Sequence, residues 1–284
     1  MRWKGQRQSD NIEDMRGKSS RRSFGLKGGT IVVLGIALVV YLLGGNPSQV
    51  LNLLSGGGEE TATEAPLSAH DKEMTEFVGV VLAETESVWN KLFQESGRTY
   101  REPKLVLFRS GINSACGFAE SATGPFYCPA DEKVYLDLDY LEKLQQQLGA
   151  EGDFAAAYII AHEIGHHVQN LLGIIDKANR LRASAGEMEA NAATVKLELQ
   201  ADFLAGVWVH HGQKMRDFLE TGDLEEALNA ASAVGDDRIQ TQTQGYVTPD
   251  SFTHGTSAQR RYWLKKGIDT GDLEQGDTFS AEVD

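Results

Sequence analysis

Residues 157–170 read AYIIAHEIGHHVQN and contain the side chains of this chain that are best suited to chemistry. His162 and His166 are four residues apart, so on a helix their imidazoles share one face and can bind one zinc ion at about 2.0 to 2.1 Å. Glu163 is turned about 100° around the axis, where it can accept a proton from an attacking water. The spacing predicts metal-assisted hydrolysis with Glu163 as the general base.

A surface helix rich in histidine is the alternative interpretation, because a short HExxH motif also arises by chance. The neighbouring residues argue against it, since nine positions between 154 and 172 are apolar and surround the motif on most sides. Burying two histidines and a glutamate without a partner would cost several kcal/mol. We therefore expect a buried helix whose polar side chains hold a metal ion.

A second apolar helix, predicted over 187–212, contains the run VKLELQADFLAGVW. Its Glu198 and Asp202 are four residues apart on one otherwise apolar face. We predict Glu198 as the third metal ligand and Asp202 as the acceptor of an N–H from a ligating histidine. An isolated pair of this kind is more often solvated. Zinc is the expected ion, one per chain, although other divalent ions bind the same donors.

Several separate blocks occur in the order found in a known family: WKGQRQSDNIEDMRG, GPFYCPADEKVYLDL, AHEIGHHVQN, LELQADFLAGVW and FTHGTSAQRRYWLKKGIDTGDLEQGDTF. Nearly the whole chain resembles the neutral zinc metallopeptidase family of bacteria, and HEIGH with ELQAD resembles the gluzincin pattern HExxH...ExxAD of membrane-associated zinc endopeptidases. The resemblance implies a zincin-like domain in which His162, His166 and Glu198 bind zinc and Glu163 is catalytic.

The segment THGTSAQR has the spacing of a gluzincin THP....R segment, with Gly255 replacing the proline. The resemblance implies that His254 and Arg260 lie near the metal, with Arg260 beside the ligands. His254 would be catalytic by stabilising an oxyanion, or would bind the zinc in a latent state. The alternative is an ordinary turn histidine before a helix that is capped at Thr256.

The other histidines are predicted to stay off the metal. His167 points about 100° away from its neighbour, so it cannot share the same ion, and we expect it to bond Asn170 or a nearby loop. His210 and His211 are predicted to be solvated or packing residues, and His70 to lie on the surface.

The periodicities predict an α+β fold, a mostly helical domain with a small antiparallel sheet. The expected strands are 104–108 and 133–138 with PFYC as a third, and the expected helices are 68–97, 139–148, 153–174, 187–212, 224–240 and 257–267. An extended peptide could bind at the edge of this sheet, along the strand KVYLDL or along the neighbouring loop between Cys116 and Cys128, called here the cysteine loop.

Cys116 and Cys128 are the two cysteines of the chain. In a cytosolic protein they would more often be reduced core residues, whereas in an exported protein a disulfide is expected. No histidine is near enough in sequence to make them a metal site. We predict a disulfide.

The charge is distributed unevenly. Residues 1–27 carry eight Lys and Arg against three Asp and Glu, while the remainder carries 19 against 38. An uncharged apolar run follows at 28–45, GGTIVVLGIALVVYLLGG, and its length is enough to cross a thin bilayer. We predict a basic cytoplasmic head at 1–27, one transmembrane helix at 28–45, a flexible linker at 46–66 and a metallopeptidase domain at 67–284.

The positive-inside rule then predicts a single-pass protein of the bacterial inner membrane, with its N-terminus inside and its domain in the periplasm or outside the cell. The basic head would also contact anionic lipid. A cleaved signal peptide is the alternative, since 30–44 also fits an apolar signal core. A long charged segment precedes this run, and NPSQV after it lacks a small-x-small cleavage signal.

These features together predict a membrane-anchored zinc metallopeptidase that acts on a peptide or an unfolded protein. The alternatives are a zinc amidase or esterase with a non-protein substrate, and an envelope scaffold or chaperone with little turnover. The intact Glu163 speaks against the scaffold, which could lose this residue and keep its ligands. The acidic body disfavours nucleic-acid binding. The oligomeric state is not predicted.

Overall fold

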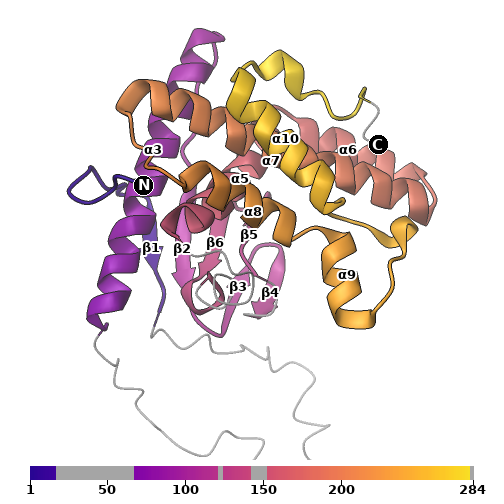
Figure 1. The fold of residues 1–284 in the computed structure, drawn as a ribbon, viewed down its shortest axis with the longest axis horizontal. Helices are drawn as coiled ribbons and strands as arrows, with labels where there is room; N and C mark the ends of the chain where they lie inside the picture. The colour runs from indigo at the N-terminus through magenta and orange to yellow at the C-terminus, as the bar shows by residue number, and fades with distance from the viewer. Residues whose placement is uncertain (17–66, 121–123, 142–151, 282–284) are drawn as a thin grey trace, which may run out of the picture. The chain divides into compact units, whose positions relative to one another are not determined.

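The computed structural model describes residues 1–16, 67–120, 124–141 and 152–281. These residues form a mostly helical structure with small sheets (Figure 1), as the periodicities predict. The predicted strand arrangement and the predicted membrane topology are both wrong, and each has a physical cause in the contacts described below.

The main sheet is mixed, whereas an antiparallel sheet was predicted. Its strands lie in the order β1 (Ile12–Asp14), β2 (Lys104–Phe108), β6 (Lys133–Asp137) and β5 (Phe126–Cys128). The central strand β2 is parallel to both β1 and β6, and only β5 is antiparallel to its neighbour. The cause is that β6 returns from the edge strand β5 and inserts beside β2, so its direction is set by β5.

A separate hairpin of β3 (Gly111–Ser114) and β4 (Gly117–Glu120) lies between β2 and β5 along the chain. A disulfide joins Cys116, in the turn of this hairpin, to the buried Cys128 at the end of β5. The predicted disulfide is therefore confirmed, and it fixes the hairpin to the edge strand.

The first long helix, α3 (Ala69–Glu95), begins where the sequence predicts. The Ser68 hydroxyl oxygen accepts a hydrogen bond from the Asp71 backbone N–H, and the Asp71 carboxylate accepts one from the Ser68 backbone N–H. The two residues form a capping box at the start of the helix. The remaining described helices are α5 (Asp153–Leu171), α6 (Ile174–Ser184), α7 (Glu187–Arg216), α8 (Asp223–Ala233), α9 (Asp236–Gln244) and α10 (Ser257–Thr270). The predicted helix 224–240 is thus two helices that meet at Gly235. The predicted helix 139–148 extends mostly into residues outside the description.

The core lies where α3, α5 and α7 meet the sheet. Its largest fully buried side chains include Trp89 from α3, Tyr158 from α5, and Phe203 and Trp208 from α7. In Figure 1, α3 runs alongside β1, and most of the other helices lie above the sheet and to the right of it. The helix α5 contacts both the sheet and α7, so it occupies the centre of the fold.

Residues 1–16 are part of this folded unit. Their strand β1 pairs with β2, and Ser9 and Asn11 donate hydrogen bonds to the buried Glu86 carboxylate on α3. Arg7 also pairs with Glu86, and the buried Arg16 lies 3.7 Å from the Asp71 carboxylate. The four basic residues that the structure describes in this segment, Arg2, Lys4, Arg7 and Arg16, therefore all pair with acidic groups of the folded unit.

These contacts correct the predicted localisation. A single membrane crossing between residues 16 and 67 would put β1 and β2 on opposite faces of a bilayer, yet the two strands are hydrogen-bonded. Within the described parts of the chain, no helix is long and apolar enough to cross a membrane. The predicted anchor at 28–45 and linker at 46–66 lie outside the described residues.

The helices α7 and α10 approach so closely that only glycine fits between them. A Cβ on Gly206 would lie 2.2 Å from the Leu264 carbonyl oxygen, and one on Gly267 would lie 2.1 Å from the Phe203 carbonyl oxygen. Both neighbours are backbone atoms, which cannot rotate away. This contact sets the distance between α7 and α10, and therefore how near Arg260 of α10 lies to α7.

Gly206→Ala is therefore expected to lower the free energy of unfolding by about 3 kcal/mol, because the added methyl group separates two packed backbones. Urea denaturation measures the change. Gly186→Ala is the control, since its Cβ would meet only the flexible Glu189 side chain, and it should cost less than about 1 kcal/mol. Equal costs for the two variants would contradict this account.

Candidate metal centre

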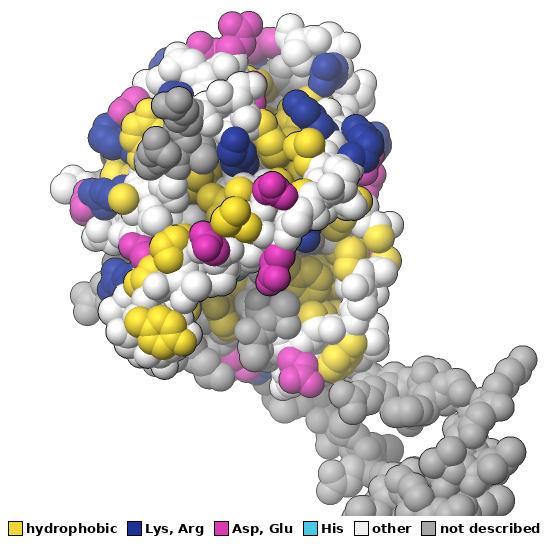
Figure 2. Space-filling view, turned by 90° about the vertical axis from the view of Figure 1, so that its right-hand side faces the viewer, with side chains coloured by type: hydrophobic (Ala, Val, Ile, Leu, Met, Phe, Trp, Pro, Cys, Tyr) yellow, Lys and Arg dark blue, Asp and Glu magenta, His cyan; other side chains and the backbone are white. Residues whose placement is uncertain are grey.

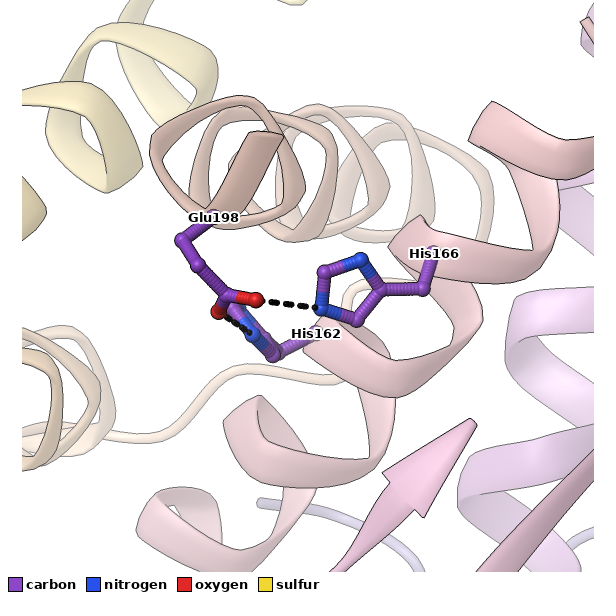
Figure 3. A group of neighbouring side chains, drawn as sticks. All are labelled: His162, His166 and Glu198. Atoms are coloured by element: carbon purple, nitrogen blue, oxygen red, sulfur yellow. Dashed lines mark hydrogen bonds and ion pairs between the residues drawn. The ribbon is translucent and has the colours of Figure 1, made fainter. Parts of the chain in front are cut away.

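The helices α5 and α7 bring together the three side chains predicted as metal ligands (Figure 3). His162 Nε2 lies 3.1 Å from Glu198 Oε2, and His166 Nε2 lies 3.4 Å from Glu198 Oε1. One ligand atom from each residue lies within 4.8 Å of the other two. Both imidazoles therefore turn the same ring nitrogen toward a shared carboxylate.

The sequence of α5 explains why α7 can come this close. Gly165 lies inside HEIGH, and a Cβ there would be 2.9 Å from the Ala201 carbonyl oxygen of α7. Most of the other residues of α5 are buried, including His162 and Glu163, and none is exposed. The motif thus lies on a helix buried on most sides, as its apolar neighbours predict.

Asp202 lies one turn after Glu198 on α7 and is fully buried. Its Oδ1 accepts hydrogen bonds from His162 Nδ1 at 2.8 Å and from the Tyr158 hydroxyl at 2.6 Å. Arg260 of α10 donates to both carboxylate oxygens, at 2.8 and 3.0 Å. The carboxylate holds His162 with its Nε2 toward Glu198 and joins three helices at one point.

The electrostatics of the group favour positive charge. Burial opposes the charge on His162, but Asp202 and Glu198 raise the pKa of its imidazole to about 10. Burial also opposes the charge on His166, whose pKa is nevertheless raised by Glu198. Burial would raise the pKa of Glu198, but the two imidazoles hold it well below its usual value. A group that retains protons in this way also attracts a divalent cation.

The residues fit a zinc ion by the chemistry of their donors. His162 Nδ1 donates to Asp202, and His166 Nδ1 is 2.9 Å from the Gln169 amide oxygen, so in the neutral form of each ring the lone pair available to a metal ion is on Nε2. Two imidazole nitrogens and one carboxylate are the donor set of catalytic zinc sites that leave one position open.

A cleft of about 570 Å³ opens beside this group. Glu163, His254 and Arg260 line it together with the three predicted ligands, and Phe126 and Tyr127 of β5 form part of its wall. Residues of α6 and α9 border it as well. Figure 2 looks onto the side of the molecule where these two helices lie, and hydrophobic side chains gather there in patches between charged ones.

Residues 1–279 match the protein family described as "Putative neutral zinc metallopeptidase". The chain belongs to this family.

Two groups of relatives are similar over most of their length. "Uncharacterized protein YpfJ" of Escherichia coli (strain K12) is 47% identical over 292 residues, which cover 100% of both chains. "Uncharacterized protein Rv2575" of Mycobacterium tuberculosis (strain ATCC 25618 / H37Rv) is 43% identical over 206 residues, which are 69% of this chain and 67% of that protein. No solved structure matches this metallopeptidase-family chain significantly.

His254 lies on the loop before α10 and is held by Asp236 at the start of α9. The Asp236 carboxylate accepts backbone N–H bonds from Thr253, His254 and Gly255, and its Oδ1 is 3.1 Å from His254 Nδ1. Thr256 caps α10, so the ordinary helix-start geometry is present as well. His254 lines the cleft but is not part of the three-residue metal group.

The other histidines have structural contacts within the described residues. His167 is buried, and its Nε2 donates to the Arg101 carbonyl oxygen. The Tyr127 hydroxyl lies 3.0 Å from His167 Nδ1 and also accepts a hydrogen bond from the Asn170 side chain. Burial lowers the pKa of His167, which suits this neutral role. His210 and His211 donate to backbone carbonyls near the end of α10, and His70 is exposed.

Two residues that support the predicted ligands, Gln169 through His166 and Tyr158 through Asp202, were missed from the sequence. Gln169 follows His166 by three positions, so the helical spacing could have revealed it. Tyr158 precedes His162 by four positions and shares its Asp202 partner. Burial raises the pKa of Tyr158 well above its usual value, so its hydroxyl stays protonated and can donate.

Asp202→Asn is expected to destabilise the fold by about 3–5 kcal/mol at neutral pH, because it leaves the buried Arg260 guanidinium without a counter-charge. Burial would raise the pKa of Asp202, but Arg260 and His162 lower it from 3.8 to about 2. The native carboxylate therefore contributes its stability above pH 3.8 and loses it as the pH falls toward 2.

Urea denaturation across pH 2 to 7 measures both effects. The matched control is Glu132→Gln, which breaks an exposed pair with Arg101 and should change stability little. A small cost for Asp202→Asn, similar to that of the control, would show that the buried carboxylate does not stabilise this junction.

Proposed function

We propose that this chain is a zinc-dependent peptidase that hydrolyses peptide bonds with Glu163 as general base, and that His162, His166 and Glu198 hold the ion. The observation that carries the proposal is the orientation of the two imidazoles. Both Nδ1 atoms are hydrogen-bonded and both Nε2 atoms face Glu198. When bound by these three residues, a zinc ion would polarise a substrate carbonyl and acidify a water.

Glu163 follows His162 on α5 and lines the same cleft. Its carboxylate accepts a proton from the attacking water and passes it to the nitrogen that leaves when the peptide bond breaks. The low exposure of this side chain keeps bulk water from competing for the proton.

His254 is suited to stabilise the negative charge that develops on the carbonyl oxygen. Asp236 fixes the backbone around it and binds its Nδ1, so the imidazole is held in one orientation at the cleft wall. Because Nδ1 faces the Asp236 carboxylate, the donor to the oxyanion would be the Nε2–H of the imidazolium form, and a donor held in advance of the reaction costs no reorganisation in the transition state. The alternative of a latent zinc ligand has less support, because His254 lies outside the three-residue group.

The substrate class follows from the cleft wall. Of the two segments predicted to bind a peptide, β6 is paired on both sides, whereas β5 is an edge strand that lines the cleft, so β5 is the one that can accept an extended peptide. Backbone hydrogen bonds to such an edge suit peptides and unfolded proteins of varied sequence. A non-peptide amide or ester would use none of this backbone, which is why we favour a peptide.

The experiment that tests the function compares zinc content and casein cleavage in the full chain. Glu163→Gln should retain about one zinc ion and lose activity at least about 100-fold, because only the proton acceptor is removed. Glu198→Ala should lose zinc as well as activity. Glu187→Gln, on an exposed glutamate of α7, is the control and should change neither.

Full zinc content without cleavage in the native chain would favour the low-turnover scaffold. Cleavage that survives Glu163→Gln would remove the proposed base. A native chain that binds no zinc would contradict the proposed metal centre itself.

His254→Ala is expected to lower kcat about 100-fold with a small change in KM, since the lost contact is made to the developing oxyanion. Asp236→Asn should lower kcat less, because the imidazole remains but is oriented less firmly. Zinc content should stay unchanged in both variants. An increase in activity for His254→Ala would instead identify this residue as an inhibitory ligand.

A further inference from the structure

Two buried glutamines connect His166 to the C-terminal part of the chain. His166 Nδ1 is 2.9 Å from Gln169 Oε1. Gln169 Nε2 donates to Gln200 Oε1 at 3.0 Å, and Gln200 Nε2 donates to the Gly276 carbonyl oxygen at 2.8 Å. We propose that Gln169 and Gln200 are positioning residues that fix His166 for the metal and link metal retention to residues 273–279.

The direction of this relay is set by backbone carbonyls, which can only accept hydrogen bonds. The Gly276 carbonyl requires the amide nitrogen of Gln200, so the Gln200 oxygen must face Gln169. Gln169 then presents its own nitrogen there, and the same nitrogen donates to the Leu197 carbonyl oxygen at 2.8 Å. Two independent carbonyls thus impose the same orientation on Gln169.

The orientation of Gln169 determines the tautomer of His166. The remaining Gln169 atom is an oxygen, and it can bond His166 only if Nδ1 carries the hydrogen. The lone pair of the neutral ring is then on Nε2, the atom 3.4 Å from Glu198. His162 reaches the same state through the Asp202 carboxylate, so the two histidines are fixed by different chemistry.

The far end of the relay is firmly attached to α7. Thr278 donates to the Lys196 carbonyl oxygen at 2.6 Å, and Lys196 Nζ donates to the Phe279 carbonyl oxygen at 3.2 Å. A Cβ on Gly276 would lie 2.4 Å from the Phe203 ring. The segment therefore lies close against α7, with its carbonyl directed at Gln200.

The test, which rests on the proposed zinc centre, measures zinc affinity of the full chain by competition with a chelator. Gln169→Met keeps the approximate side-chain volume and removes the acceptor, so zinc should bind about 10- to 100-fold more weakly. Gln169→Glu loses the two donated bonds but keeps an acceptor for His166, so it should bind zinc at least 10-fold more tightly than Gln169→Met. Gln200→Met should cause a smaller loss than Gln169→Met.

Gln213→Met is the matched control, because Gln213 is on α7 like Gln200 and its side chain bonds Asp217 and Leu219, away from the site. It should leave zinc affinity unchanged. Equal affinities of Gln169→Met and the native chain would overturn the relay. Equal losses in the Glu and Met variants would also overturn it, because the role would then be packing alone.

Folding and the proposed function are separated by two further readings. Circular dichroism of the zinc-free variants identifies any that fail to fold. If Gln169→Met is one of them, Gln200→Met decides the proposal: a measurable loss of zinc affinity in this variant supports the relay, and native affinity overturns it. A native chain that binds no zinc would overturn the metal centre and the relay together, whereas a relay failure leaves native zinc binding intact.

Discussion

The buried carboxylate of Asp202 is the contact on which the rest of the site depends. It bonds His162 and Tyr158 from α5 and Arg260 from α10, so one side chain joins three helices. A buried charge is tolerated only when its partners are in place, and removing one partner costs far more than the pair gains. The same group that orients the proposed metal-binding imidazole of His162 therefore also enforces the packing of the helices that carry the candidate site.

The two proposed histidine ligands are supported in different ways, and the difference follows from their surroundings. His162 faces the junction with α10, where a guanidinium is present to balance the Asp202 carboxylate. His166 faces Gln169, which is bonded to α7 and, through Gln200, to the C-terminal segment. Neutral amides suit that side because their donors and acceptors are all used by neighbours, and no counter-charge is needed.

For the described residues 1–16, the basic charge near the N-terminus has a structural explanation within the folded unit. Basic residues near the N-terminus meet acidic groups of the domain, including Arg7 with Glu86, and β1 extends the sheet opposite to the cleft-lining strand β5. The sheet thus has β1 at one edge and β5 at the other, and only β5 lines the cleft. This division suits a domain that binds extended chains at one edge only.

The sequence by itself determined most of the local elements and singled out the candidate site residues. Apolar periodicity located α3, α5, α7 and α10, because burial of one face imposes a helical repeat. The i, i+4 spacing of His162 and His166 fixed their common face before any fold was known. What only the tertiary structure decided was pairing at long range: the parallel β1 and β2, the meeting of Arg260 with Asp202, and the relay from Gln169 to Gly276. No local period encodes which distant strand or helix supplies a partner, because that choice depends on how all the elements pack together. For the same reason, a basic head followed by an apolar run suggested a membrane topology that the contacts of residues 1–16 contradict.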